Sequence, residues 1–392
     1  MTMNATVHGA LRAANPVFFD DAAAFIAGNT FDRPTLVISR ARVARQYDAL
    51  SEGLGRARIH YAVKANPAPE IVRMLVLKGS GFDCASRQEI ELCLSQGADA
   101  AHLSFGNTIK KAADIAFAYS VGVTLFAADS EAELEKIAAH APGARVYIRL
   151  IVENSLAEWP LSRKFGCAPS KLPALLDLAR DLGLVAWGLS FHVGSQTREA
   201  SYWEPVLDQI APLWHEARAA GHDLQLLNIG GGFPAFYGQT VQAPTAYAAK
   251  VVELVTARFG DVPELMAEPG RGMVAEAGHI VAEVLLVSKK SDDDLHRWVY
   301  LDIGRFSGLA ETEGEAIRYQ FVTAHDGGET GPCVLAGPSC DSADILYEKR
   351  PVNLPLALSD GDRIVIRNCG AYTSSYSSVG FNGFPPLDVV VL

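Results

Sequence analysis

The sequence predicts an α/β protein with a TIM-like (β/α)8 barrel followed by an antiparallel β domain. From residue 35 to about residue 270, short β-branched runs alternate with longer segments of helical periodicity, which is the pattern of parallel strands joined by helices. After about residue 274, short apolar runs alternate with turns rich in Gly, Asp and Pro. The length of 392 residues is enough for about two or three domains.

Nine segments in the first part have the length and composition of buried strands. They are residues 35–39, 60–64, 81–84, 102–105, 123–126, 145–149, 187–192, 226–229 and 264–268. Eight strands close a barrel of this type, so one segment is surplus. We expect residues 35–39 to lie outside the barrel, because this segment precedes every motif that carries functional side chains.

Helical segments between these strands show apolar residues that recur on one face. They are residues 87–96, 170–182, 200–220 and 245–259. The clearest helix start is at Ser130, because Glu133 three positions later would complete a capping box. We therefore place the barrel at residues 40–273 and the β-sheet domain at residues 1–39 plus 274–392.

The charge balance is acidic, with 34 Lys and Arg against 45 Asp and Glu and a net charge of −11. Such a chain lacks the basic excess that neutralises nucleic-acid phosphates or an anionic membrane surface. We therefore expect no nucleic-acid partner and no membrane partner, and a small cationic substrate suits the sign of the charge. The first 20 residues do not resemble a signal peptide, and no stretch approaches the ~20 apolar residues that span a bilayer.

Six cysteines are scattered without a C-x-x-C pair or the His/Cys spacing of zinc sites. This pattern favours a reducing compartment, so we expect a cytoplasmic protein. It also argues against a bound metal.

Functional side chains and glycines gather where the predicted barrel strands end. They are Lys64, Asp83, Arg149, His192, Gly230, Gly231, Gly232 and Glu268. Because the carboxyl ends of barrel strands meet at the rim that carries the active site in such enzymes, we expect these residues to share one site.

Lys64 ends an apolar strand, which would bring its amine to this rim and partly remove it from water. A desolvated lysine has a lowered pKa and can attack a carbonyl carbon. An isolated lysine at a strand end more often only extends its amine into the solvent. The catalytic interpretation of Lys64 therefore depends on the other residues of the rim.

Two glycine-containing loops, residues 230–233 and 268–271, follow the last two barrel strands. Backbone without Cβ atoms beside an arginine can offer N–H groups to a phosphate, and late-strand loops are the usual phosphate site of this barrel. A tight turn also explains a glycine run. His192 and Ser195 precede these loops, and a lone histidine at such a position is more often packed than catalytic.

Seven motifs occur in order along the chain. They are Tyr-Ala-Val-Lys-Ala-Asn at 61–66, Phe-Asp-Cys-Ala-Ser at 82–86, Ser-Phe-His-Val-Gly-Ser at 190–195, Gly-Gly-Gly-Phe at 230–233, Glu-Pro-Gly-Arg at 268–271, Gly-Pro-Ser-Cys-Asp-Ser at 337–342 and Gly-Ala-Tyr-Thr at 370–373. Together they resemble the pyridoxal-phosphate-dependent decarboxylases of the alanine-racemase-like fold, in the ornithine decarboxylase branch. The resemblance extends from about residue 35 to the end of the chain.

The resemblance implies that pyridoxal 5'-phosphate binds in the barrel with its aldehyde bonded to Lys64. Glu268 would face the pyridine nitrogen, where its charge favours the protonated ring, and His192 would stack on the ring. The other cofactor contacts that the resemblance implies are Asp83, Arg149, Ser195, Gly230, Gly231, Gly232, Gly270, Arg271 and Tyr372.

Cys340 matches the family cysteine that returns a proton to Cα after CO2 leaves. It completes the implied catalytic set with Lys64, His192 and Glu268; outside this motif, a small apolar role would be the commoner one. Asp302 and Asp341 match carboxylates that bind the distal ammonium of a diamino acid. In the family these loops come from the partner subunit, so the resemblance implies a homodimer with a shared active site.

The implied reaction is decarboxylation of L-ornithine to putrescine and CO2, a step of polyamine biosynthesis. Diaminopimelate has a distal carboxylate, which Asp302 and Asp341 would repel. Lysine is one methylene longer than ornithine, a difference worth only ~1–3 kcal/mol, so a lysine or dual lysine/ornithine decarboxylase making cadaverine stays open. A catalytically silent regulatory homologue is a more distant alternative, although every implied cofactor contact is present.

Overall fold

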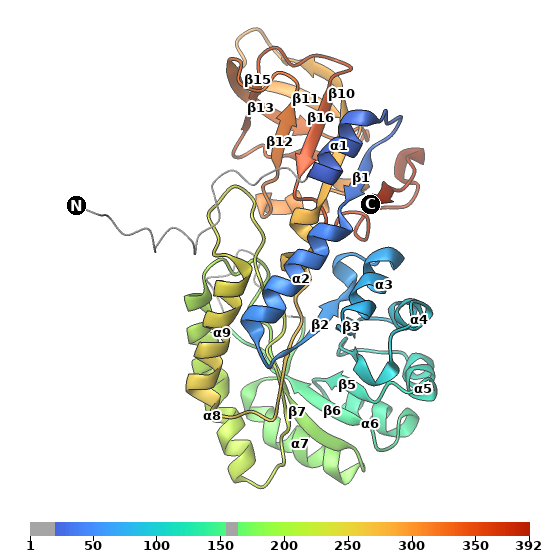
Figure 1. The fold of residues 1–392 in the computed structure, drawn as a ribbon, viewed down its shortest axis with the longest axis vertical. Helices are drawn as coiled ribbons and strands as arrows, with labels where there is room; N and C mark the ends of the chain where they lie inside the picture. The colour runs from blue at the N-terminus through green and yellow to red at the C-terminus, as the bar shows by residue number, and fades with distance from the viewer. Residues whose placement is uncertain (1–19, 154–163) are drawn as a thin grey trace, which may run out of the picture. The chain divides into compact units, whose positions relative to one another are not determined.

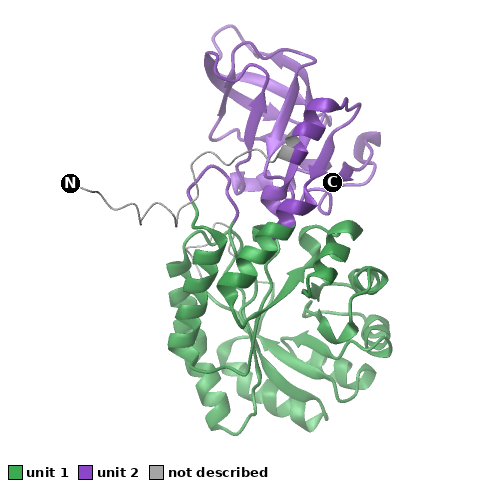
Figure 2. Ribbon diagram, in the orientation of Figure 1, with its two compact units in different colours: residues 1–12, 44–234, 241–272 green, residues 13–43, 235–240, 273–392 purple. Residues whose placement is uncertain are grey.

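The computed structural model describes residues 20–153 and 164–392, and the first 19 residues of the predicted β-sheet domain lie outside it. The described chain divides into two compact units (Figure 2). Unit 1 contains residues 44–234 and 241–272, and unit 2 contains residues 20–43, 235–240 and 273–392. None of the described helices has both the length and the hydropathy needed to cross a bilayer.

Unit 1 is built on a closed barrel of eight parallel strands (Figure 1). The strands are β2 (Arg58–Ala62), β3 (Gly81–Cys84), β4 (Leu103–Phe105), β5 (Leu125–Ala128), β6 (Arg145–Arg149), β7 (Val185–Ser190), β8 (Leu226–Asn228) and β9 (Glu264–Ala267). β9 pairs in parallel with β2, which closes the barrel. The predicted (β/α)8 architecture is confirmed.

The surplus strand of the prediction is β1 (Thr35–Ile38), which lies outside the barrel as expected. It pairs antiparallel with β10 (Gly278–Ser288) and parallel with β17 (Asp388–Val391), both in unit 2. All four of its residues are buried. A fully buried strand has the same continuous apolar composition as a barrel strand, so only its place in the chain distinguished it.

Helix α2 precedes the first barrel strand, and the other helices of this part of the chain follow barrel strands. They are α2 (Arg40–Leu54), α3 (Pro69–Leu77), α4 (Arg87–Ser95), α5 (Ala112–Ser120), α6 (Glu131–His140), α7 (Leu172–Asp181), α8 (Glu204–Ala219), α9 (Pro244–Phe259) and the short α10 (Arg271–Val274). The boundary between the two units falls within α2 and again within α10. The helix expected at 200–220 begins with a 3-10 turn over Ala200–Trp203.

The capping box predicted at Ser130 is wrong. α6 begins at Glu131, but the Ser130 side chain makes no capping hydrogen bond. Glu133 pairs instead with Lys110 at 2.9 Å and with Lys136, so its carboxylate is engaged elsewhere.

The start of α4 is fixed by two hydrogen bonds. The N-cap Ser86 hydroxyl accepts the N–H of Glu89, and the Glu89 carboxylate accepts the N–H of Ala85, the residue before the N-cap, at 2.6 Å. These bonds fix the chain directly after β3, which carries Asp83.

Unit 2 contains a nine-stranded sheet and the helix α1 (Asp20–Gly28). The strands not yet named are β11 (Arg297–Leu301), β12 (Gln320–Thr323), β13 (Thr330–Ala336), β14 (Ile345–Leu346), β15 (Val352–Pro355) and β16 (Arg363–Arg367). Most neighbours are antiparallel, as predicted, whereas β1–β17 and β11–β13 are parallel. Val37, Val281 and Val365 pack with Ala22 and Ile26 of α1 to form one core of this unit.

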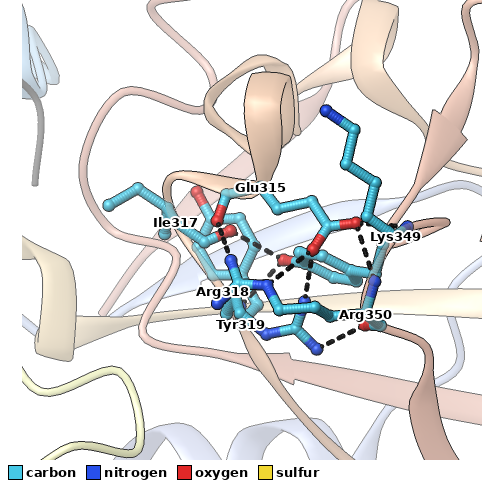
Figure 3. A network of polar contacts seen from close by, with 7 residues as sticks. Glu315, Ile317, Arg318, Tyr319, Lys349 and Arg350 are labelled. Atoms are coloured by element: carbon cyan, nitrogen blue, oxygen red, sulfur yellow. Dashed lines mark hydrogen bonds and ion pairs between the residues drawn. The ribbon is translucent and has the colours of Figure 1, made fainter.

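A polar network around Glu315 joins two segments of unit 2 (Figure 3). The buried Glu315 carboxylate accepts the backbone N–H groups of Lys349 and Arg350 and pairs with the guanidinium groups of Arg318 and Arg350, at 2.7 to 3.1 Å. This network anchors the chain that follows β14. The loop before β14 carries Cys340 and Asp341.

Candidate active site

The predicted site residues of unit 1 come from six barrel strands, β2, β3, β6, β7, β8 and β9, whose carboxyl ends share one rim. Lys64 lies in a 3-10 turn directly after β2, Asp83 in β3, Arg149 at the end of β6, and His192 just after β7. Glu268 follows β9. Charge interactions link Glu268 with Asp83, Lys64 and Arg149, so the fold brings these groups together as predicted.

Lys64 differs from the sequence expectation in one respect. β2 ends at Ala62, and Lys64 falls in the turn Val63–Ala65, where its side chain is exposed rather than partly desolvated. The flanking Val63 and Ala65 are buried, so the turn itself is held firmly. Lys64 is nevertheless within electrostatic range of Asp83, His192 and Glu268.

Asp83 is a buried acid in a cationic environment. Burial raises its pKa, and the positive charges of Lys64 and Arg149 oppose that shift. Its Oδ1 atom is buried and makes no hydrogen bond among residues 20–153 and 164–392. A buried polar atom of this kind requires a partner, which a bound ligand can supply.

Tyr147 was not identified from the sequence. Burial raises the pKa of its phenol well above the usual value, and the nearby carboxylates of Glu268 and Asp83 raise it further, so the group stays neutral. Tyr147 lies two residues before Arg149 on β6, and residues two apart in a strand face the same side. That spacing was the signal that could have identified it.

Glu268 has two competing influences on its charge. Burial and the neighbouring charge of Asp83 raise its pKa to about 7, whereas Asn228, Lys64 and Arg149 oppose the rise. The Asn228 amide donates to the Glu268 carboxylate at 2.5 Å. Glu268 can therefore change its protonation state near neutral pH, and it responds to any cation that binds beside it.

His192 is a neutral imidazole in this environment. Desolvation lowers its pKa well below 6.5, and the positive charges of Arg149 and Lys64 lower it further. Its Nδ1 atom accepts the N–H of Gly194 at 3.0 Å, so Nε2 carries the hydrogen in the neutral ring. A neutral, oriented ring suits stacking on a flat ligand.

The glycine turn after β8 approaches its neighbours too closely for a side chain. Gly230 has φ +69°, and a Cβ there would lie 2.3 Å from the backbone oxygen of Phe191; one on Gly231 would lie 2.8 Å from that of Glu268. The N–H groups of Gly231 and Gly232 make no hydrogen bond within the described parts of the chain. Bare N–H groups in such a turn can bind the oxygens of a phosphate.

Arg271 and Ser195 provide a cation and a hydroxyl in unit 1. The Arg271 Nε atom donates to the Ser195 hydroxyl at 3.2 Å, and Arg271 is buried. Gly270, the residue before it, is also buried. The orphaned oxygen of Asp83, the glycine turn and this Arg–Ser pair together fit a ligand that has both a phosphate and a polar ring.

Cys340 and Asp341 lie on an exposed loop of unit 2 between β13 and β14. The Cys340 N–H donates to the Asn382 side-chain oxygen at 3.2 Å, and the Asp341 carboxylate accepts the N–H of Ala343 at 2.8 Å. Tyr372 has φ +53° and lies in the same unit. Cys340 and Asp341 are therefore both exposed on the same loop.

Asp344 shapes this loop, although it lies outside the motif at 337–342. Its carboxylate is 3% exposed and accepts the N–H of Arg305, the N–H of Ser339 and the Ser339 hydroxyl, at 2.7 to 3.2 Å. A Cβ on Gly337 would lie 2.3 Å from it. Asp344 thus holds Ser339, the residue before Cys340, close to its own position after Cys340. The spacing of residues in the sequence could not reveal these contacts.

Asp302 has different neighbours from Asp341. It lines a cavity of about 180 Å³ with Glu283, Phe31 and Arg363, and its carboxylate accepts the N–H of Glu283 at 2.8 Å. Burial raises its pKa to about 6. None of the hydrogen bonds or ion pairs among the described residues joins Asp302 to Asp341 within one chain.

Comparison with known proteins agrees with this chemistry. Residues 40–275 match the family of pyridoxal-dependent decarboxylases, in its pyridoxal-binding domain. The lysine/ornithine decarboxylase of Selenomonas ruminantium is 34% identical, with 90% of this chain and 87% of that protein covered.

Two solved structures are similar over most of this chain. The lysine/ornithine decarboxylase of Vibrio vulnificus complexed with cadaverine is 32% identical, with a TM-score of 0.85 and coverage of 96% and 100% of the two chains. The arginine decarboxylase of Paramecium bursaria Chlorella virus bound to agmatine is 27% identical, with a TM-score of 0.85 and coverage of 94% and 100%. The chain thus belongs to the pyridoxal-phosphate-dependent decarboxylases, which are carboxy-lyases.

Proposed function

We propose that this enzyme decarboxylates L-ornithine to putrescine and CO2, with lysine as the alternative substrate. The observation that carries the proposal is the exposed Asp341 carboxylate beside Cys340 on a loop that Asp344 holds in place. An anion at this position attracts a distal ammonium and repels a distal carboxylate. The names of the relatives, which include lysine, ornithine and arginine decarboxylases, support a basic amino acid as substrate.

Each residue of the rim has a proposed task. Lys64 bonds to the cofactor aldehyde, His192 packs on the ring, and Glu268 holds a proton on the ring nitrogen. Gly231, Gly232, Ser195 and Arg271 bind the phosphate, with Gly230 and Gly270 beside them in unit 1. A phosphate contact by Tyr372 stays a prediction from the resemblance. When bound, pyridoxal phosphate accepts the electron pair that is released as CO2 leaves Cα.

Cys340 is proposed to donate the proton that converts the decarboxylated carbon into the amine product. Asp341 binds the far ammonium, and Asp302 stays a prediction from the resemblance, since its carboxylate interacts with β10 in the same chain. Asp83 and Arg149 complete the polar surroundings of the cofactor. A cytoplasmic location is also proposed, supported by six free cysteines.

Substrate choice is tested by comparing kcat/KM for ornithine, lysine, arginine and meso-diaminopimelate. We expect ornithine to be preferred, and Asp341→Asn to lower its kcat/KM about 10- to 100-fold, mainly through KM, because a charged hydrogen bond is lost. Asp293→Asn, an exposed carboxylate of the same unit, is the matched control. A preference for diaminopimelate, or an unchanged KM in Asp341→Asn, would contradict the proposal.

We also propose a homodimer in which each active site receives Cys340 and Asp341 from the partner. An exposed apolar face supports this: Tyr376 and Val379 are 56% and 83% exposed, and Phe381 and Phe384 are exposed nearby in the sequence. Asn382 of the same segment contacts Cys340. Aromatic surface of this kind is typical of protein interfaces.

Complementation between two inactive variants tests the shared site. Lys64→Ala and Cys340→Ala are each expected to make almost no putrescine. Mixed and reassociated, they should recover about a quarter of the wild-type rate, because half of the random dimers contain one intact site. No recovery despite subunit exchange, or full activity of a 42.0 kDa monomer, would contradict the shared site.

A further inference from the structure

Asn228 is a buried amide that no motif identified. It is the last residue of β8 and is 1% exposed. Its Nδ2 atom donates to the Glu268 carboxylate at 2.5 Å, and its Oδ1 atom accepts the N–H of Gly230 at 2.9 Å. The side chain thus connects the acid after β9 with the glycine turn after β8.

These contacts form a closed ring of hydrogen bonds. The Glu268 N–H donates to the Gly230 carbonyl at 2.8 Å, so both polar groups of Gly230 are tied to the same two residues. The ring passes from the Asn228 side chain through Gly230 and the Glu268 backbone to the Glu268 carboxylate. A shift of the glycine turn would therefore also displace the carboxylate.

The ring decides which way the amide faces. The Gly230 N–H can only donate, so the amide oxygen must face Gly230 and the NH2 group must face Glu268. An NH2 group can only donate, so Glu268 is required to accept. The charged carboxylate is the better acceptor, and a hydrogen bond to the charged form favours that form.

We propose that Asn228 is a positioning residue that favours the charged form of Glu268 and couples its orientation to the glycine turn. This inference rests on the proposed task of Glu268 at the cofactor ring and extends it to a residue that does not touch the cofactor. Two changes at one position can separate its effects. Asn228→Asp removes the donor and adds an acid, and Asn228→Ala removes both hydrogen bonds.

The charged neighbours of Glu268 set the background for this test. Asp83 on β3 is a second acid, whereas Lys64 after β2 and Arg149 on β6 are cations. The phenol of Tyr147 on β6 is kept neutral. The two acids and the two cations carry opposite charges of equal number. A carboxylate added at position 228 adds one more negative charge, which raises the pKa of Glu268.

The first readout uses the apoprotein and does not depend on activity. Infrared difference spectra against pH should show the Glu268 carboxyl band, identified by its loss in Glu268→Gln, with a midpoint near 7. In Asn228→Asp, Glu268 and the new aspartate form a pair of acids. This pair should take up its first proton at a pH at least about one unit above the wild-type midpoint. An unchanged midpoint would overturn the inference.

The second readout is cofactor binding to the apoprotein. Asn228→Ala should weaken the binding of pyridoxal phosphate about tenfold or more, because the glycine turn loses its link to Glu268. Asn353→Ala, at an exposed asparagine on β15, is the matched control and should behave like the wild type. Wild-type affinity in Asn228→Ala would contradict the coupling.

The third readout is the pH profile of decarboxylation. Asn228→Asp should recover activity relative to the wild type as the pH falls, because the new carboxyl group can donate again once it is protonated. A purely structural defect would give a constant ratio. A fully active Glu268→Gln variant would contradict the proposed task of Glu268. If Glu268→Gln is impaired while Asn228→Asp and Asn228→Ala behave like the wild type, only the inference on Asn228 is contradicted.

Discussion

Lys64→Ala is expected to give a folded protein that does not retain the cofactor absorbance and does not decarboxylate ornithine. The lysine amine is the group proposed to bond to the cofactor aldehyde, and alanine has no nucleophile at this position. We expect the rate of CO2 release to fall by a factor of about 10³ or more, by analogy with the loss of other covalent catalysts. Absorbance spectra after incubation with pyridoxal phosphate and gel filtration provide the measurement.

Lys111→Ala is the matched control for this change. Lys111 is exposed and lies just before α5, in the loop after β4, so the variant loses a lysine of the same unit without touching the proposed site. It should keep the absorbance and the activity. A wild-type protein that stays colourless with added cofactor would instead favour the silent regulatory homologue.

Glu268→Gln is expected to have the second largest effect, a fall in kcat of about 10²- to 10³-fold. Glutamine keeps the shape but removes the negative charge that is proposed to hold a proton on the ring nitrogen, and loss of one preorganised electrostatic contact typically costs this much. Single-turnover measurements of CO2 release separate the chemical step from product release. Glu264→Gln, at the exposed start of β9, is the control.

The apoprotein gives an independent check on Glu268. Its pKa in the fold is about 7, raised from 4.5 by burial and by Asp83. The folded state therefore holds the proton more tightly than the unfolded state, and stability falls as the pH rises from 4.5 to 7. Glu268→Gln should remove this loss, so its thermal stability relative to the wild type should improve between about pH 5 and pH 8. The opposite trend would contradict the assigned shift.

Much of the site was predictable because strand ends in a parallel barrel converge. Lys64, Asp83, Arg149, His192 and Glu268 were all identified from their positions after apolar runs, and their charges interact in the structure. Two details were not predictable. The exposure of Lys64 depends on a 3-10 turn. The capping box at Ser130 does not form because the Glu133 carboxylate pairs with Lys110 instead.

Two residues that sequence reasoning missed act through partners that are distant along the chain. Asn228 bonds to Glu268 forty positions later, and Asp344 accepts the N–H of Arg305. Such pairs carry no local spacing signal. Tyr147 alone had one, because it shares a strand face with Arg149.

The sequence by itself determined the order of strands and helices, the rim on which the chemistry lies and the family to which the chain belongs. The order of elements and the rim follow from local periodicity, which reflects the covalent geometry of strands and helices. The family follows from the seven motifs that resemble the pyridoxal-phosphate-dependent decarboxylases. The tertiary structure alone decided which buried polar atoms meet. A buried amide or carboxylate must find a partner, and that partner is whichever group the closing of the barrel or the pairing of the sheet brings within hydrogen-bond distance.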